Sequence, residues 1–273
     1  MRILVTGATG FIGRHVVRNL LDSGHSVLAQ TTRLTLHNKG INTNCHYVCF
    51  KLEQHISDEV INELKKCEKV IHLAWAGLGN FKDLGHIEDH LMCQYRFIKR
   101  LVSNGLTDIT ITGTCLEYGL QNGSISVGDR TDPIVSYAIA KDSLRRFLML
   151  LQTIYSFDLK WIRLFYMYGE GQSEKSLLSQ LKKALDDGDE FFPMSPGDQL
   201  RDYLPVEKVA QRVVKISLEN VSGVFHCSSN KPISVLNLVK NFMSLEKCHI
   251  EIRTHEFPYN DYEPLAFWGS KED

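Results

Sequence analysis

The chain has 273 residues, of which 43% are hydrophobic and 23% charged, and its formal net charge is −1. This size suits one large α/β domain, or a main domain with a small second lobe, and the balanced charge argues against a dedicated nucleic-acid binder. The seven cysteines stand singly, without a C-x-x-C pair, which favours reduced thiols. No apolar run approaches the roughly 20 residues of a membrane span, and the chain opens on a strand-like segment, so we expect a cytoplasmic protein.

In the first part of the chain, short apolar runs alternate with segments of helical period. We expect strands over Arg2–Val5, Val27–Thr31, Cys45–Phe50, Val70–Ala74, Ile109–Thr112 and Leu159–Phe165. We expect helices over Phe11–Ser23, Asp58–Lys66, His86–Asn104 and within Pro133–Tyr155. This alternation predicts βαβ units with right-handed crossovers, and therefore a doubly wound parallel sheet of the α/β class.

The alternation stops after Tyr168. We expect further helices over Ser176–Asp187, Val206–Leu218 and Ser234–Met243, short strands over Val224–His226 and Ile250–Thr254, and a loop over Phe191–Gly197. We therefore divide the chain into a main domain, residues 1–165 with about 204–228, and a smaller lobe formed by residues 166–203 and 229–273.

A glycine-rich turn, Thr6-Gly7-Ala8-Thr9-Gly10-Phe11-Ile12-Gly13, joins the first expected strand to the first helix. Glycines here permit a tight turn and a close approach of the backbone to a pyrophosphate, which the helix N-terminus then binds. A tight βα turn without a ligand is the alternative, but the position on the first strand favours a Rossmann-type dinucleotide-binding domain. The cofactor-binding candidates of this segment are Gly7, Thr9, Gly10, Phe11, Ile12, Gly13 and Arg14.

The end of the second expected strand bears on the choice of cofactor. NAD enzymes usually carry Asp or Glu there for the ribose hydroxyls, whereas this chain has Thr31, Thr32 and Arg33. Arg33, helped by Arg14, would suit a 2′-phosphate, although each arginine could equally be a solvated surface side chain. We therefore expect NADP(H), with NAD(H) as the alternative.

Tyr137 and Lys141 stand four residues apart, on one face of an expected helix. A nearby ammonium favours the phenolate and lowers the pKa of a tyrosine, which makes it fit for proton transfer. Thr114 follows the fifth expected strand and would hold a substrate oxygen beside the phenol. Y-x-x-x-K alone fits an aromatic core residue and a solvated lysine, but the glycine turn and Thr114 favour the catalytic reading.

With these motifs the chain resembles the extended short-chain dehydrogenase/reductases, the family of nucleotide-sugar epimerases, dehydratases and reductases. The resemblance runs from Met1 to about Gly269. It implies that Tyr137 is the proton donor or acceptor, that Lys141 tunes its pKa and contacts the nicotinamide ribose, and that Thr114 is the catalytic hydroxyl. It also implies cofactor contacts from residues after the third strand and around the end of the fourth, namely Leu52, Leu73, Ala74 and Trp75.

Two later segments resemble the substrate side of nucleotide-sugar enzymes. Arg201, in the stretch Leu200–Val206, matches an arginine that contacts the diphosphate, a task suited to the fork of guanidinium donors. A local ion pair of Arg201 with Asp202 is the plain alternative. Tyr166 stands where family members often have a substrate-binding asparagine. Residues 263–269 resemble the tail of nucleotide-sugar reductases.

The chain departs from the family at residues that follow Thr114. Dehydratases of the family carry an Asp-Glu pair there as acid and base, whereas this chain has Cys115 and Leu116, with Glu117 displaced by one. We therefore expect no dehydration, and we take Cys115 as a small packing residue.

The combined expectation is an NADPH-dependent reductase of a keto group on a nucleoside-diphosphate sugar, such as a dTDP-, GDP- or CDP-linked 4-keto-6-deoxyhexose. A 4-epimerase that retains NAD would use the same three residues and is the alternative, and a non-catalytic NADP-binding sensor is a third. We expect no metal site and no nucleic-acid partner. The resemblance implies a homodimer through helices near His86–Asn104 and Pro133–Tyr155, where Leu144, Phe147, Leu148 and Leu151 suit either the partner or the sheet.

Overall fold

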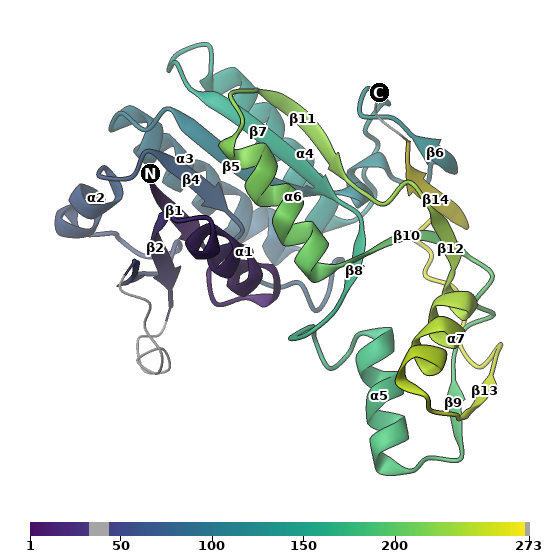
Figure 1. Ribbon diagram of the computed structural model, residues 1–273. Coiled ribbons are helices and arrows are strands. Elements are labelled where there is room, and N and C mark those ends of the chain that lie inside the picture. Colours follow the sequence, from purple (N-terminus) through teal and green to yellow (C-terminus); the bar gives the residue numbers. More distant parts are fainter. Residues whose placement is uncertain (33–43, 271–273) are drawn as a thin grey trace.

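A seven-stranded parallel sheet forms the centre of the computed structural model, which describes residues 1–32 and 44–270 (Figure 1). Its order is β11-β7-β5-β4-β1-β2-β3. The strands are β1 (Arg2–Thr6), β2 (Ser26–Thr31), β3 (Cys45–Cys49), β4 (Lys69–His72), β5 (Asp108–Thr114), β7 (Asp158–Leu164) and β11 (Gly223–Cys227). Because all seven are parallel, their carboxyl ends lie at one edge, where ligands bind in such sheets.

Helices cover both faces of this sheet, as the doubly wound expectation requires (Figure 1). They are α1 (Phe11–Asp22), α2 (Asp58–Leu64), α3 (Met92–Ser103), α4 (Ser136–Leu151) and α6 (Val206–Leu218). Side chains alternate along each strand, so Leu4 and Leu28 join a core with α2, α3 and α4. Their neighbours Ile3, Val5 and Val27 face the other way and pack with α1 and α6. The predicted fold class is confirmed.

A second sheet lies beyond the carboxyl edge of β7 and has the order β12-β10-β14-β6, with β8 also paired to β10 (Figure 1). Its strands are β6 (Gly123–Ile125), β8 (Tyr166–Tyr168), β10 (Leu200–Pro205), β12 (Pro232–Ser234) and β14 (Ala266–Gly269). Next to it, α5 (Leu177–Asp187) and α7 (Val235–Glu246) pack with a two-stranded sheet of β9 (Phe191–Pro193) and β13 (Glu251–Arg253). The division into two domains stays a prediction.

Two segments differ from the sequence-based expectation. The expected loop over Phe191–Gly197 contains strand β9. This strand forms because Glu251–Arg253, about sixty residues later in the chain, supplies its parallel partner β13. The expected helix over His86–Asn104 begins with a π-helical turn, η1 (His86–Leu91), before α3. Such turns recur at functional sites.

Three of the four apolar residues named on α4 pack against the sheet. Leu144, Leu148 and Leu151 are buried in the core, whereas Phe147 is exposed and packs edge-on against Tyr95. The three leucines therefore serve the fold, and the homodimer stays a prediction. Within the described part of the chain, no helix is long and apolar enough to cross a membrane.

Candidate active site

The glycine turn forms a close cradle between β1 and α1. Gly7 has a positive φ of 64°, and a Cβ there would lie 2.9 Å from the backbone nitrogen of Ala74. A Cβ on Gly13 would lie 2.1 Å from the carbonyl oxygen of Gly7. Gly10 caps α1 without a side-chain hydrogen bond, so the first-turn N–H groups remain available to an anion. These residues fit the pyrophosphate of a dinucleotide.

A pocket of about 640 Å³ opens beside this cradle. The predicted cofactor residues that line it are Gly7, Thr9, Gly10, Thr32, Leu52, Ala74 and Trp75. Residues that sequence reasoning missed also line it: Gln30, Thr31, Glu53, Ala76 and Gln94. Gln30 accepts from the N–H of Gly7 (2.9 Å) and donates to the carbonyl of Phe50 (2.7 Å), so it fixes the glycine turn to the end of β3.

The other predicted cofactor residues do not line this pocket. Phe11, Ile12 and Gly13 form the first turn of α1, and Leu73 packs in the core on the α1 side. Arg14 packs against Gly171, where a Cβ would lie 2.5 Å from a guanidinium nitrogen. It therefore does not line the pocket beside Thr31 and Thr32. Arg33 lies outside the described residues.

The end of β4 is held by buried polar contacts. His72 Nδ1 bonds the Thr6 hydroxyl (2.8 Å) and His72 Nε2 bonds Oε1 of Gln94 (2.5 Å), while Gln94 Nε2 donates to the carbonyl of Ala74 (3.1 Å). Burial lowers the pKa of His72 to about 3, so its imidazole is neutral at physiological pH. This network fixes the backbone of Leu73 and Ala74 beside the glycine turn.

Thr114 ends β5 and caps the short 3₁₀ turn η2 (Cys115–Tyr118). Its hydroxyl accepts from the N–H of Leu116 (3.3 Å), and its own N–H donates to the carboxylate of Glu117 (2.9 Å). This reciprocal capping box fixes the backbone of Thr114 at the carboxyl edge of the sheet.

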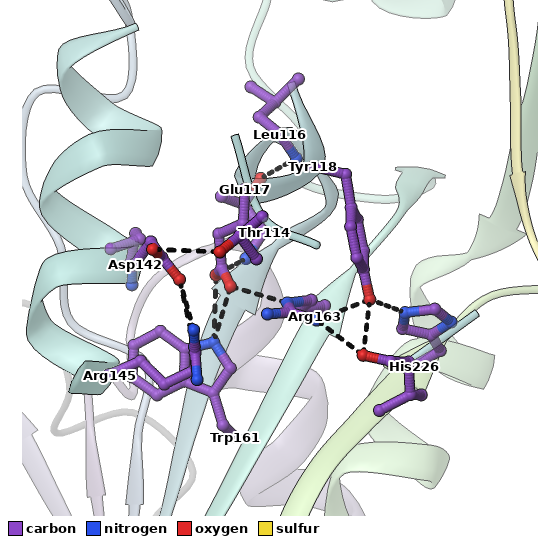
Figure 2. Close-up of polar contacts among 12 residues, drawn as sticks. Thr114, Leu116, Glu117, Tyr118, Asp142, Arg145, Trp161, Arg163 and His226 are labelled. Carbon is purple, nitrogen blue, oxygen red and sulfur yellow. Dashed lines mark hydrogen bonds and ion pairs between the residues drawn. The ribbon is translucent and has the colours of Figure 1, made fainter. Parts of the chain in front are cut away.

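Glu117 is fully buried in a network that sequence reasoning missed (Figure 2). Its carboxylate accepts from Arg163 Nε (2.7 Å) and from Trp161 Nε1 (3.0 Å), and Arg163 also donates to the Tyr118 hydroxyl (2.6 Å). That hydroxyl bonds His226 in turn (2.5 Å). The displaced glutamate therefore has structural partners and does not reach the site as an acid or base.

Tyr137, near the start of α4, lies among aromatic rings. Its ring stacks on Phe81 with centroids 5.1 Å apart and meets Trp75 edge-on at 5.9 Å. Burial and then the negative charge of Glu117 raise the pKa of Tyr137, and a hydrogen bond with Thr114 acts in the opposite direction. The expected lowering is not seen, because Lys141 does not bond the phenol and burial disfavours the phenolate. Tyr137 is therefore protonated at neutral pH.

Lys141 is buried beneath the Trp75 ring. Its Nζ donates to the carbonyl of Thr112 (2.8 Å) and lies 4.1 Å from the Trp75 ring centroid and 5.9 Å from that of Tyr137. Burial lowers the pKa of Lys141 to about 7, although the carboxylate of Glu117 opposes the shift. The structure thus brings Thr114, Tyr137 and Lys141 together, with Trp75 between them and the cofactor pocket.

The buried lysine predicts a pH-dependent stability. The unfolded chain holds this proton up to about pH 10.5 and the folded chain up to about pH 7, so folding releases it between these values and stability rises with pH there. Relative to Lys141→Met, the wild type should gain on the order of 1 kcal/mol of unfolding free energy per pH unit from pH 7 towards 9. Urea unfolding at several pH values measures this, and parallel curves for the two proteins would contradict it.

The expected substrate residues Arg201 and Tyr166 lie side by side on β10 and β8. The Arg201 guanidinium donates to the carbonyls of Leu200 (2.9 Å) and Leu265 (3.1 Å) and lies 5.4 Å from the Tyr166 ring centroid. Its ion partner is Glu263 (3.5 Å), so the alternative of a pair with Asp202 is wrong. Asp202 accepts instead from the backbone N–H groups of Ser229 and Asn230.

Sequence reasoning also passed over a histidine pair. His86 and His90 stand four apart, a spacing that two metal ligands on a helix can have, and their ring centroids lie 5.8 Å apart. Both ring nitrogens of His86 are engaged, Nδ1 with Trp75 Nε1 (3.1 Å) and Nε2 with the carbonyl of Asn80 (3.0 Å). Residues 1–32 and 44–270 contain no group of three metal-ligating side chains.

Comparison with known proteins agrees with this arrangement. A family model described as the NAD dependent epimerase/dehydratase family matches residues 3–226. The chain belongs to this family. It is 30% identical to a dTDP-6-deoxy-L-talose 4-dehydrogenase (NAD(+)) of Aggregatibacter actinomycetemcomitans, over 99% of the chain and 100% of that protein. It is 25% identical to a probable UDP-glucuronate 4-epimerase of Rhizobium meliloti, over 80% of the chain and 68% of that protein.

Solved structures of the family share the fold. A UDP-N-acetylglucosamine 4-epimerase of Methanobrevibacter ruminantium, in complex with UDP-N-acetylmuramic acid, has a TM-score of 0.84 at 22% identity and covers 97% of this chain and 89% of its own. A UDP-glucuronic acid 4-epimerase of Bacillus cereus, in complex with UDP-glucuronic acid and NAD, has a TM-score of 0.83 at 19% identity, covering 98% and 90%. The preference for NADP(H) finds no support in these comparisons.

Proposed function

We propose that this protein is a nicotinamide-dependent oxidoreductase of a nucleoside-diphosphate sugar that reduces a 4-keto group, with a 4-keto-6-deoxyhexose as the substrate class. One observation carries the proposal: Tyr137 is hydrogen-bonded to Thr114, with buried Lys141 on the same helix and a dinucleotide cradle next to them. The relative named a dTDP-6-deoxy-L-talose 4-dehydrogenase supports it, because the reverse of that oxidation is reduction of a 4-keto sugar.

The chemistry then divides among residues of this chain. A bound nicotinamide would supply the hydride to the carbonyl carbon. Tyr137 gives its phenolic proton to the oxygen that becomes an alkoxide, and Thr114 holds that oxygen by a hydrogen bond. Lys141 places a positive charge under the site and, with a pKa of about 7, exchanges protons readily near neutral pH. Arg201 binds the diphosphate and sets the distance of the hexose from Tyr137.

Dehydration of the sugar is disfavoured by the turn after Thr114. Cys115 and Leu116 are both buried, and burial raises the pKa of the Cys115 thiol, so neither is an acid or base at neutral pH. The carboxylate of Glu117 is bonded to Arg163 and Trp161. An epimerase would use the same three residues as a reductase, and the preference for reduction is supported by the relative named a dTDP-6-deoxy-L-talose 4-dehydrogenase.

For the cofactor we propose NAD(H) in place of the NADP(H) that Thr31 and Arg33 predicted. Among the described residues that line the cofactor pocket, Glu53 is the one with a charged side chain. Its negative carboxylate would repel the 2′-phosphate of NADP(H). The family is NAD-dependent by its description. We expect NAD⁺ to bind at least about tenfold more tightly than NADP⁺ in calorimetry. Equal or reversed affinities would show that a cation such as Arg33 determines the choice.

The function is tested with purified protein, a dTDP-4-keto-6-deoxyhexose and NADH or NADPH. We expect reduced-nicotinamide absorbance to fall in proportion to the sugar consumed, with a 4-hydroxy sugar as the product. Conversion of a non-keto nucleotide sugar without added cofactor would show an epimerase instead. Binding of cofactor without turnover of either substrate class would favour the sensor.

A further inference from the structure

Glu263 brings a carboxylate into the substrate side of the site from the segment between β13 and β14. Its Oε1 accepts from the Tyr166 hydroxyl (2.7 Å), and its Oε2 accepts from Arg201 (3.5 Å) and from Asn260 (3.3 Å). The Glu263 side chain is 15% exposed and that of Arg201 5%. The carboxylate is thus partly enclosed, and its strongest bond is the neutral one to Tyr166.

The position of this carboxylate follows from its neighbours. Tyr166, which it contacts, packs in one small cluster with Cys115, and Cys115 directly follows Thr114. After burial, the charge of Glu263 is the largest influence that raises the pKa of the Cys115 thiol. Glu263 therefore contacts Arg201, the proposed anchor for the diphosphate, and lies near the turn that follows Thr114, the proposed hydroxyl for the reacting oxygen. The hexose of a nucleotide sugar has to span these two points, so it passes the carboxylate.

Among the described lining residues of the pocket beside Arg201, the arginine is the one cation, and Lys82, whose Nζ lies 5.5 Å from the Tyr262 ring centroid, is paired with Asp261. This pocket has a volume of about 420 Å³, and its described lining residues include two charged side chains, Arg201 and Glu263. In the proposed complex the diphosphate binds the Arg201 guanidinium. Its Nη2 is available for this, because among the described residues it has only the long contact to Glu263. A neutral hydroxyl can then donate to the Glu263 carboxylate, whereas a carboxylate on the sugar would face a like charge in a partly dehydrated place.

We propose that Glu263 is a specificity-determining residue that selects nucleotide sugars with an uncharged hexose and rejects those with a C6 carboxylate. This inference rests on the proposed function, because it takes Arg201 as the diphosphate anchor. Relatives of this chain are named for both kinds of sugar, one as a probable UDP-glucuronate 4-epimerase and another as a dTDP-6-deoxy-L-talose 4-dehydrogenase. Specificity of this kind comes from a repulsive element, here the fixed carboxylate.

The test compares Glu263→Gln with the wild type by calorimetric binding of dTDP, dTDP-glucose and dTDP-glucuronic acid. Glutamine keeps an oxygen that accepts from Tyr166 and removes only the charge. We expect the wild type to bind the glucuronate about tenfold or more weakly than the glucoside, and E263Q to reduce that ratio to about threefold or less. Glu251→Gln is the matched control, because it makes the same change of charge on β13, where Glu251 pairs with exposed Arg253. It should keep the wild-type ratio.

Two outcomes separate this inference from the proposed function. If Arg201→Gln binds all three compounds as the wild type does, Arg201 is no diphosphate anchor, and the proposed function loses its substrate site. If Arg201→Gln weakens all three while the wild type binds glucoside and glucuronate equally, the anchor stands and the role of Glu263 is wrong. A ratio that is unchanged in E263Q would also overturn that role.

Discussion

Tyr137→Phe should lower kcat by about 10²–10⁴-fold, because it removes the proton donor and leaves the ring in place. Phenylalanine keeps the stacking on Phe81 and the edge contact with Trp75, so the melting temperature should stay close to that of the wild type. Steady-state kinetics with the 4-keto sugar, together with thermal unfolding, measure both quantities. Affinity for the cofactor should be unchanged, because the cradle of Gly7, Gly10 and Gly13 is untouched.

The matched control is Tyr95→Phe. Tyr95 packs against Phe147 on the outer side of α3 and α4, away from Thr114 and Lys141, so its hydroxyl should not matter to turnover. Activity retained in Tyr137→Phe would sink the catalytic assignment and favour a cofactor-binding sensor. If kcat falls equally in Tyr137→Phe and Tyr95→Phe, the loss reflects a general effect of removing a tyrosine hydroxyl on the fold.

Arg163→Met should reduce the unfolding free energy by about 3–5 kcal/mol, because it leaves the buried carboxylate of Glu117 without its cation. The pair is fully enclosed in the network of Figure 2, with side chains 3% and 0% exposed. A Cβ on Gly113 would lie 2.2 Å from Trp161 Nε1, so the surrounding packing leaves little room for water to solvate the charge. Urea denaturation measures the loss.

The double variant Glu117→Gln with Arg163→Met distinguishes charge from packing. It removes both charges, so most of the lost stability should return. Lys183→Met serves as a surface control, because both it and its partner Asp187 are exposed, and we expect its urea midpoint to stay at the wild-type value. If the double variant is as unstable as Arg163→Met alone, the loss arises from the shape of the arginine and its bond to Tyr118, not from an unpaired charge.

The central sheet and the cofactor cradle could be predicted because both follow from local patterns. Strands such as Arg2–Thr6 are short apolar runs between turns, and the glycines of the first turn stand at fixed spacing. Thr114, Tyr137 and Lys141 were found by the same means, and the structure places them together. Their catalytic roles stay predictions.

The second sheet and the polar contacts around the site could not be predicted in this way. Its strands are only three to six residues long, and β14 pairs with β10 and β6 from distant parts of the chain. The alternative reading paired Arg201 with Asp202, one residue away, whereas its ion partner is Glu263, because a strand turns neighbouring side chains to opposite faces. The raised pKa of Tyr137 depends on burial, which the spacing of Y-x-x-x-K does not contain.

The position of β14 has a consequence for the order in which the two binding sites can form. β14 is an interior strand, between β10 and β6, although it comes late in the chain. Until residues 266–269 have left the ribosome, β10 and β6 each keep an open edge, and Glu263 arrives only shortly before them. The described lining of the cofactor pocket, by contrast, ends at Gln94. Synthesis therefore delivers the parts of the cofactor pocket first, and a protein shortened before Glu263 would keep those parts while lacking the carboxylate proposed to select the sugar.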